Sequence, residues 1–168
     1  MQRIIASFGL IALMLGAADP ASALSPEDLV GTWKMLSTVR QVEGSDKVIE
    51  NLGEHPKGIL IITQDHRFMI IETGDGRKAA STTEEFAALQ KSELAYSGLV
   101  TFSPDPNNSQ GLKMTNKVDI AWNEEWTGTD QTRFLSLDGN RLTIPTPLLK
   151  NPISGEMATS TLVFERSK

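Results

Sequence analysis

The sequence predicts an all-β domain of antiparallel strands, folded as a sandwich or a barrel. Three observations favour this fold class. Most of residues 24–168 form short apolar runs separated by turn-forming residues. Residues 112–122 alternate with a clear period of two, so that strand has one buried face. Asp138-Gly139-Asn140 separates two further runs, and its glycine supplies the positive backbone angle that a short hairpin loop requires.

The first half of the domain is expected to contain a strand over residues 30–40 and then a tight hairpin. Two apolar runs, residues 58–63 and 68–72, flank Gln64-Asp65-His66-Arg67, which places Asp65-His66 at the hairpin tip and makes His66 a turn residue. Both faces of the hairpin are apolar, which a sheet with one face in water would not tolerate. Either a helix of the same chain or a second subunit must cover the outer face, and the helix is favoured because it is close in sequence.

One helix is expected to interrupt the strands, beginning near Thr82 or Thr83. Thr82 and Glu85 have the spacing of a capping box, and Phe86 and Leu89 begin a partial apolar stripe. The remaining segments are a Pro/Asn/Ser-rich loop at residues 103–109 and three later strands at residues 132–137, 141–146 and 159–166.

The first 23 residues have the composition of a secretory signal peptide. Met1-Gln2-Arg3 supplies the positive end, residues 4–18 are almost entirely apolar, and Ala21-Ser22-Ala23 is an A-x-A site. A membrane anchor needs about 20 apolar residues, whereas this run is shorter and is broken by Asp19-Pro20. We therefore expect cleavage after Ala23 and an exported protein, periplasmic or extracellular, whose single mature domain spans residues 24–168.

Composition narrows the partners of this domain. The 168 residues carry 16 basic and 21 acidic groups, a formal net charge of -5, and no run rich in lysine and arginine. Such a chain lacks the electrostatic footprint of a protein that binds nucleic acid or anionic lipid, and no stable membrane insertion is expected. Cysteine is absent, which excludes disulfides, thiol chemistry and an acylated lipoprotein cysteine.

Six short motifs occur in order along nearly the whole domain. They are Leu29-Val30-Gly31-Thr32-Trp33-Lys34, Pro56-Lys57-Gly58-Ile59-Leu60, Tyr96-Ser97-Gly98, Trp126-Thr127-Gly128 with Arg133, Leu137-Asp138-Gly139-Asn140-Arg141-Leu142 and the final Phe164-Glu165-Arg166. Together they resemble the lipocalin-like domain family of bacteria and fungi. The resemblance implies an up-and-down antiparallel barrel of about eight strands, here with one short helix, whose interior can hold one small ligand.

The sequence departs from the pattern of that family in two places. Members often carry a histidine on the strand that here contains Thr115-Asn116-Lys117-Val118, and a proline before the tryptophan that here follows Asn123-Glu124-Glu125. If that histidine binds ligand or does chemistry in relatives, its role is lost here or passes to Asn116. The resemblance therefore gives little support to an enzymatic activity.

No recognisable catalytic or metal-binding motif occurs in the sequence, and we assign no cofactor. His55 and His66 are the only histidines and are expected in exposed loops, so a histidine metal site would need both loops to converge with carboxylates. Neither histidine lies near a nucleophile motif. Gly74-Asp75-Gly76 lacks the further glycine and the strand-helix context of a nucleotide site, and is expected to be a turn.

The polar candidates for ligand binding are those that alternation places on inward strand faces. Arg133 alternates with Leu135, so its guanidinium is expected inside the domain, as a member of an ion pair or as a clamp for an acidic ligand group. Tyr96 is expected to turn its ring inward, where its hydroxyl needs a partner. Asn116 lies between apolar residues, where an unpaired amide would cost about 1–3 kcal/mol, so it needs a neighbour or a ligand.

Apolar candidates complete the predicted site. Trp33, at the start of the first strand, is expected to close one end of the interior, as a structural plug or as the floor of the ligand site. Trp122 and Trp126 either line one end or belong to the core. The predicted apolar walls are Met35, Val118, Ile120 and Leu135.

These residues favour an exported protein that binds a small hydrophobic or amphipathic molecule inside the domain, as a monomer or weak homodimer. One alternative is a cofactor-independent isomerase or cyclase, in which Tyr96, Arg133 or an acidic residue moves a proton. The other is a protein-interaction barrel with a packed interior and an apolar hairpin as its interface. A binder predicts a cavity of roughly a few hundred cubic ångströms, an enzyme adds a perturbed carboxylate or tyrosine, and an interaction module exposes an apolar patch.

Export predicts a specific mature chain. Protein recovered from the exported fraction should have the mass of residues 24–168, because signal peptidase cleaves after small residues of the A-x-A type. Intact-mass spectrometry measures this directly. A full-length chain that fractionates with the membrane would contradict the prediction.

Overall fold

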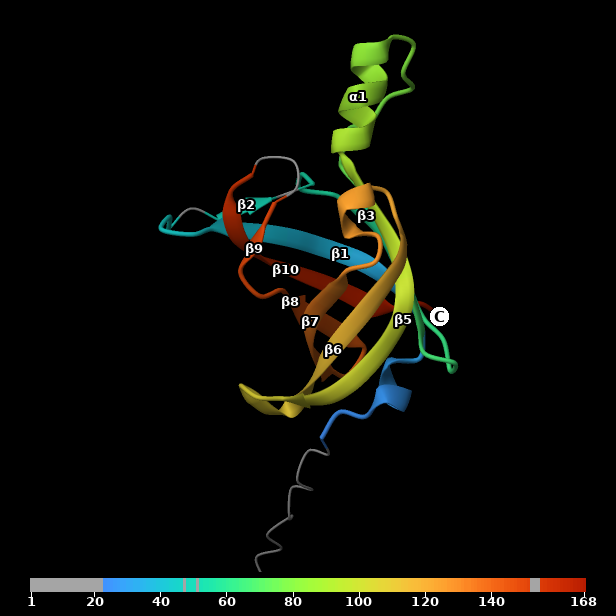
Figure 1. Cartoon of the computed structure of the whole chain (residues 1–168), viewed down its shortest axis with the longest axis vertical. Coiled ribbons are helices and arrows are strands. Elements are labelled where there is room, and N and C mark those ends of the chain that lie inside the picture. Colours follow the sequence, from blue (N-terminus) through green and yellow to red (C-terminus); the bar gives the residue numbers. More distant parts are fainter. Residues whose placement is uncertain (1–22, 47, 51, 152–154) are drawn as a thin grey trace, which may run out of the picture.

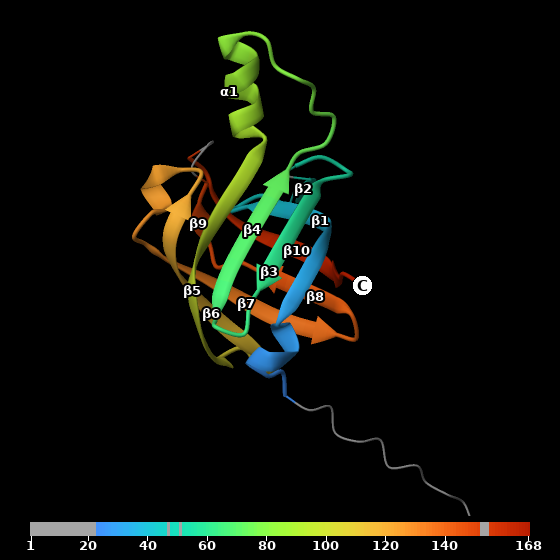
Figure 2. The same ribbon diagram turned by 90° about the vertical axis from the view of Figure 1, so that its right-hand side faces the viewer.

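Ten strands dominate the computed structural model (Figures 1 and 2), which describes residues 23–46, 48–50, 52–151 and 155–168. They are β1 (Gly31–Val42), β2 (Val48–Glu50), β3 (Lys57–Ile62), β4 (Arg67–Thr73), β5 (Glu93–Asp105), β6 (Asn108–Ala121), β7 (Asp130–Asp138), β8 (Arg141–Pro145), β9 (Leu149–Lys150) and β10 (Met157–Arg166). The helical elements are α1 (Thr83–Lys91) and two short 3-10 turns, η1 (Pro26–Leu29) and η2 (Glu124–Trp126).

Eight of these strands close into an antiparallel barrel. Their order is β1, β3, β4, β5, β6, β7, β8 and β10, and β10 pairs back with β1. Apart from the closing pair, strands that are neighbours in the barrel are also successive barrel strands along the chain. The short strands β2 and β9 lie outside the ring and pair with β1 and β10. The up-and-down barrel of eight strands is therefore confirmed. The predicted signal peptide, residues 1–23, lies outside the described residues except for Ala23.

The local turn and capping predictions are confirmed. His66 belongs to the turn between β3 and β4, where it has a left-handed φ of 63°, and Gly139 has a φ of 55° between β7 and β8. Thr82 caps α1 because the backbone N–H of Glu85 donates to its hydroxyl, while the Glu85 carboxylate accepts from the backbone N–H of Thr82. These features depend only on neighbouring residues, which is why the sequence alone predicts them.

The prediction of a loop over residues 103–109 is wrong, because most of this segment belongs to strands β5 and β6. Pairing between β5 and β6 continues through most of this segment, from Ser103 opposite Lys113 to Asp105 opposite Asn108. Only Pro106 and Asn107 lie between the two strands. The Pro/Asn composition therefore marks the tip of a long hairpin instead of an extended loop.

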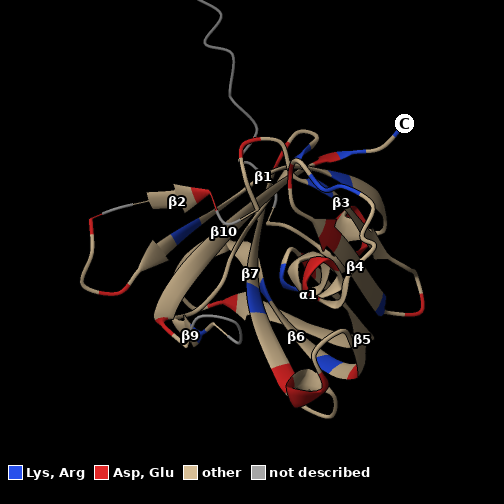
Figure 3. Ribbon diagram, turned by 90° about the horizontal axis from the view of Figure 1, so that it is seen from above, with Lys and Arg blue, Asp and Glu red and all other residues tan. Residues whose placement is uncertain are grey.

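Helix α1 does not cover the outer face of the β3–β4 hairpin, contrary to expectation. It projects from one end of the barrel, as Figures 1 and 3 show, and none of its residues is buried. The reason is its connection: only Ser92 separates α1 from β5, so the helix leads away from the sheet. Ile59, Met69 and Ile71 on the outer face are 52%, 42% and 51% exposed. A second subunit stays the predicted cover for this face.

The opposite end of the barrel is closed by η1 and the start of β1. Trp33 is fully buried, and its indole N–H donates to the carbonyl of Leu29 at 2.9 Å. The Arg166 guanidinium lies over the Trp33 ring, 4.1 Å from its centroid, and also donates to the carbonyls of Val30 and Asp28. Trp33 is thus held at its edge by Leu29 and on one face by Arg166, and this buried ring fills the end of the interior.

At Gly98 the pairing of β5 with β6 contains a bulge, which sets the position of the last residues of β6. The register changes between Ser97, opposite Ile120, and Gly98, opposite Val118, so β6 has one extra residue, Asp119. A Cβ on Gly98 would overlap the Asn116 side-chain oxygen and the Lys117 carbonyl. Only glycine therefore allows the two strands to approach this closely.

Replacing Gly98 by alanine should destabilise the fold, because the added methyl group meets backbone as well as side-chain atoms. We expect Gly98→Ala to lower the free energy of unfolding by about 2–4 kcal/mol. Urea denaturation followed by tryptophan fluorescence measures the change. Gly74→Ala is the matched control, since a Cβ there has its nearest neighbours at 3.4 Å. Equal unfolding midpoints for the two variants would contradict the prediction.

Candidate functional site

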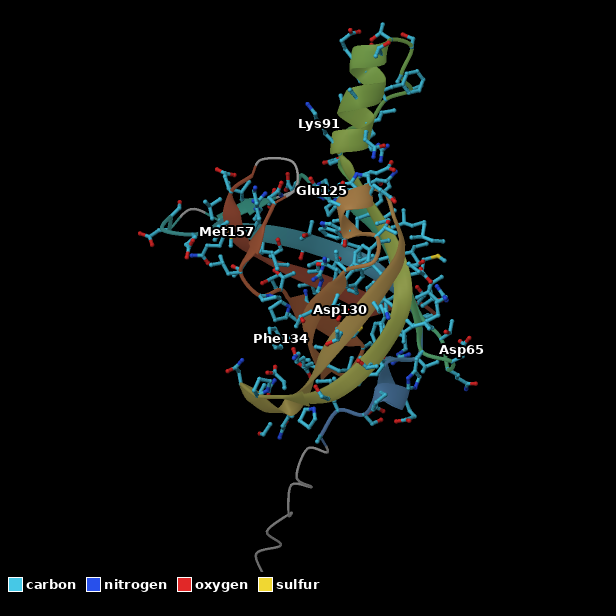
Figure 4. The ribbon with its side chains drawn as sticks, in the orientation of Figure 1. Asp65, Lys91, Glu125, Asp130, Phe134 and Met157 are labelled. Atoms are coloured by element: carbon cyan, nitrogen blue, oxygen red, sulfur yellow. The ribbon has the colours of Figure 1, made fainter. Side chains whose placement is uncertain are left out.

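A cavity of about 120 Å³ occupies the end of the barrel from which α1 projects. Exposed Lys91 and Lys150 belong to its rim, so the cavity opens to solvent there. Figure 4 shows Lys91 at the lower end of α1 and Glu125 on η2 at this same end of the molecule. The cavity is smaller than the few hundred cubic ångströms expected for a binder, which restricts it to a small ligand.

The cavity walls divide by chemistry. One group of lining residues is apolar or aromatic: Leu52, Leu94, Tyr96, Trp122, Trp126, Leu149, Ala158 and Leu162. A second group carries hydroxyl or amide groups: Thr38, Thr146, Asn151 and Ser160. The third group is charged: Arg40, Glu72, Lys91, Glu93, Arg133 and Lys150. The cavity thus combines apolar and aromatic surface, which can bury the body of a small molecule, with polar and charged groups that can orient its polar end.

Glu72 is a buried carboxyl group in this pocket. It lies on β4, is 4% exposed, and its Oε1 atom has no hydrogen-bond partner. Burial raises the pKa of Glu72 to about 8, and the Arg133 charge opposes that rise without cancelling it. At neutral pH most Glu72 side chains are therefore protonated and uncharged.

Arg133 is consequently a buried cation, and Glu72, the carboxyl group that interacts with its charge, is mostly neutral. Its side chain donates to the carbonyl of Thr132 at 2.7 Å, and its guanidinium carbon lies 5.7 Å from the centre of the Tyr96 ring. Among the described residues, no carboxylate oxygen approaches the Arg133 guanidinium to within 4.0 Å. Arginine stays charged in proteins, so an anion entering the cavity would find an uncompensated partner.

Arg40 is the second buried guanidinium and differs from Arg133. It approaches a Glu156 carboxylate oxygen to 4.0 Å and donates to the Glu156 carbonyl at 3.4 Å. Arg40 is thus already neutralised by the chain itself. Of the two buried guanidiniums in the cavity, Arg40 on β1 therefore has a carboxylate partner and Arg133 on β7 does not.

Three aromatic rings form a continuous wall at one side of the cavity. The Tyr96 and Trp126 centroids are 5.2 Å apart at an interplanar angle of 80°, and Trp126 and Trp122 are 5.5 Å apart at 88°. Burial raises the pKa of Tyr96, an effect that Arg133 opposes and Glu72 reinforces. The phenol therefore stays protonated and can donate a hydrogen bond.

The structure brings only part of the predicted site to the cavity. Arg133 and Tyr96 line it, as do Trp122 and Trp126, which the sequence left undecided. Trp33, Met35, Val118, Leu135 and Asn116 are buried but belong to the packed interior below the cavity instead of its lining.

The expected inward orientation of Ile120 is wrong, because this side chain is 69% exposed. The extra residue opposite Gly98 shifts the alternation of β6 between Val118 and Ile120, so the inward series ends at Val118. Asn116 is fully buried, and neither its side-chain oxygen nor its nitrogen has a hydrogen-bond partner. The structure thus leaves the predicted need of this amide for a partner unmet.

Sequence reasoning missed Glu72, Arg40 and Thr38. A signal for Glu72 was present, because it shares an alternating inward face of β4 with Phe68 and Ile70. Because both faces of the hairpin are apolar, the sequence did not show which face, and hence whether Glu72, points inward. Arg40 had no such signal: a register shift between Met35 and Ser37 reverses the alternation that Trp33 begins.

The histidines stand where the sequence placed them, exposed in loops at positions 55 and 66. In the described part of the chain, no three His, Cys, Asp or Glu residues are grouped closely enough to hold a metal ion. No helix within those residues is long and apolar enough to cross a membrane.

Comparison with known proteins supports the resemblance noted in the sequence. A family model described as a lipocalin-like domain matches residues 30–167. No curated protein matches the chain. The match covers every barrel strand.

Glu72 should make the stability of the fold depend on pH. The unfolded chain releases the Glu72 proton near its ordinary pKa of 4.5, while the folded chain keeps it until about 8. Rising pH across this interval therefore favours unfolding, by up to about 1.4 kcal/mol per pH unit.

Glu72→Gln removes this dependence, so its free energy of unfolding should increasingly exceed that of the native protein between pH 5 and pH 8. Chemical denaturation at several pH values measures the difference. Exposed Glu54→Gln serves as the control. A difference that stays constant with pH would contradict the assignment of Glu72.

Proposed function

This chain belongs to the lipocalin-like domain family, and we propose that its barrel binds one small, mostly apolar molecule with an acidic end in the cavity beside α1. The observation that carries this proposal is Arg133, a buried cation facing a cavity without an ionised partner. The barrel family supports binding of a small ligand in general. The acidic end is inferred from the charge of the cavity.

The energetics favour an anion over a neutral ligand. An unpaired charge in a protein interior is expensive, so a ligand carboxylate at Arg133 would relieve a cost that the apo protein carries. Hydrogen bonds to charged groups contribute about 1.5–3 kcal/mol each. Protonated Glu72 adds a donor that a carboxylate can accept from, and Tyr96 adds another.

The body of the ligand contributes through burial. Leu94, Leu162 and Ala158 present apolar surface from β5 and β10. These strands lie four places apart in a ring of eight, so they face each other across the barrel. A ligand between them exchanges water for apolar contact on two sides, which is the main source of affinity in such pockets.

Export belongs to the same proposal. The signal-peptide pattern of residues 1–23 supports a periplasmic or extracellular protein. A protein of this kind would take up its ligand outside the cytoplasm, as a monomer or weak homodimer.

A second candidate function is proton transfer on a bound molecule. It is favoured by Glu72, because a cavity carboxyl with a pKa of about 8 is suited to exchanging protons near neutral pH. Tyr96 and Arg133 would stabilise negative charge on an oxygen of such a molecule. A ligand recovered chemically unchanged after prolonged incubation with the protein would argue against this candidate.

Removal of Arg133 should weaken binding of the native ligand. Native mass spectrometry of residues 24–168, purified from the exported fraction of the source and compared with a denatured sample, should reveal a small molecule bound to the protein. Arg133→Ala should reduce its occupancy, with an affinity at least about tenfold lower.

The matched control is Arg141→Ala, which removes an exposed arginine from the start of β8 and should leave occupancy unchanged. Circular dichroism confirms that both variants are folded. Full occupancy in folded Arg133→Ala would contradict the role of this side chain.

A further inference from the structure

We propose that the ligand is a single-ring aromatic carboxylic acid, with its carboxylate at Arg133 and its ring against Trp126. This inference rests on the proposed function and names the chemical class of the ligand. It follows from the size of the cavity, from the aromatic wall and from the position of the cation relative to that wall.

The volume of the cavity limits the ligand to about one ring. Drug-sized ligands occupy pockets of about 300–1,000 Å³, whereas a cavity of about 150 Å³ holds a benzene molecule. The cavity here is about 120 Å³ and opens toward Lys91 and Lys150. Because the cavity is open on that side, a ligand need not be wholly enclosed, and the enclosed part is limited to about one six-membered ring. A long alkyl chain would have to leave most of its length in solvent.

The aromatic wall favours a flat, unsaturated ring over an aliphatic one. Trp126 makes edge-to-face contacts with both Tyr96 and Trp122, so the three rings already adopt the geometry that aromatic groups prefer. All three line the cavity. A ligand ring would extend this packing by one member, a gain that a saturated ring of similar size does not make.

The cation lies within reach of that wall. The Arg133 guanidinium carbon is 5.7 Å from the Tyr96 centroid, and the Tyr96 centroid is 5.2 Å from that of Trp126. Tyr96 therefore lies close to both the Arg133 guanidinium and the Trp126 indole. We therefore infer a ligand whose carboxylate is attached directly to a ring, or through one carbon, so that the charge and the ring meet these two partners together.

Four probes test the proposal by isothermal titration calorimetry on residues 24–168 at pH 7: benzoate, cyclohexanecarboxylate, benzamide and dodecanoate. Cyclohexanecarboxylate keeps the charge without the aromatic ring, and benzamide keeps the ring without the charge. We expect benzoate to bind about fivefold to tenfold more tightly than cyclohexanecarboxylate, and at least about tenfold more tightly than benzamide. Dodecanoate should bind no more tightly than benzoate.

Two variants separate the ring from the charge. Trp126→Leu should reduce the preference for benzoate over cyclohexanecarboxylate to less than about twofold, while Arg133→Ala should weaken both acids. Trp126→Phe keeps an aromatic ring and should retain most of the preference, which covers the case in which Trp126→Leu does not fold. Phe86→Leu, on exposed α1, is the control that removes an aromatic ring outside the cavity.

The outcomes distinguish this inference from the function on which it rests. Equal binding of benzoate and cyclohexanecarboxylate, or tightest binding of dodecanoate, would overturn the aromatic class while an Arg133-dependent acid site stands. Benzamide binding as tightly as benzoate would overturn both. Failure of every acid to bind would also overturn both.

Discussion

Closure of the barrel through the pairing of β1 with β10 is the constraint on which the rest of the structure depends. Eight strands enclose an interior only wide enough for side chains or one small ligand, so the sizes of the inward residues decide where space remains. Near η1, Trp33, Phe68 and Phe164 are buried and fill the interior. At the other end, β10 presents Ala158 and Ser160, and the space beside these small residues belongs to the cavity.

The same enclosure determines the charges in the cavity. Removal from water raises the pKa of Glu72, while arginine keeps its charge when buried, so the two side chains respond in opposite ways. The result is a buried positive charge at Arg133 that no ionised carboxylate of the cavity neutralises. A bound anion would restore neutrality without ionising Glu72, and the ionisation of Glu72 at high pH would compete with that anion for the same guanidinium. Ligand binding and the protonation of Glu72 are thereby coupled.

Local patterns in the sequence predict much of this structure. The hairpin turns at His66 and Gly139 and the capping of α1 by Thr82 involve residues close together in the chain, and all three are confirmed. Strand alternation also predicts that Tyr96 and Arg133 face the interior, since no register shift separates Arg133 from Leu135. The resemblance to the lipocalin-like domain family supplies the closed barrel, which alternation alone does not distinguish from a sandwich.

The sequence by itself determined the all-β class, the turns and the inward cation, because each follows from spacing along one strand or one turn. The tertiary structure alone decided which inward residues meet in the cavity. Register shifts beside Met35 and Gly98 bring Arg40 into the barrel and turn Ile120 out of it. One inserted residue reverses the two faces of a strand, and its position depends on pairing with a partner strand, which for Met35 is β10 at the other end of the domain.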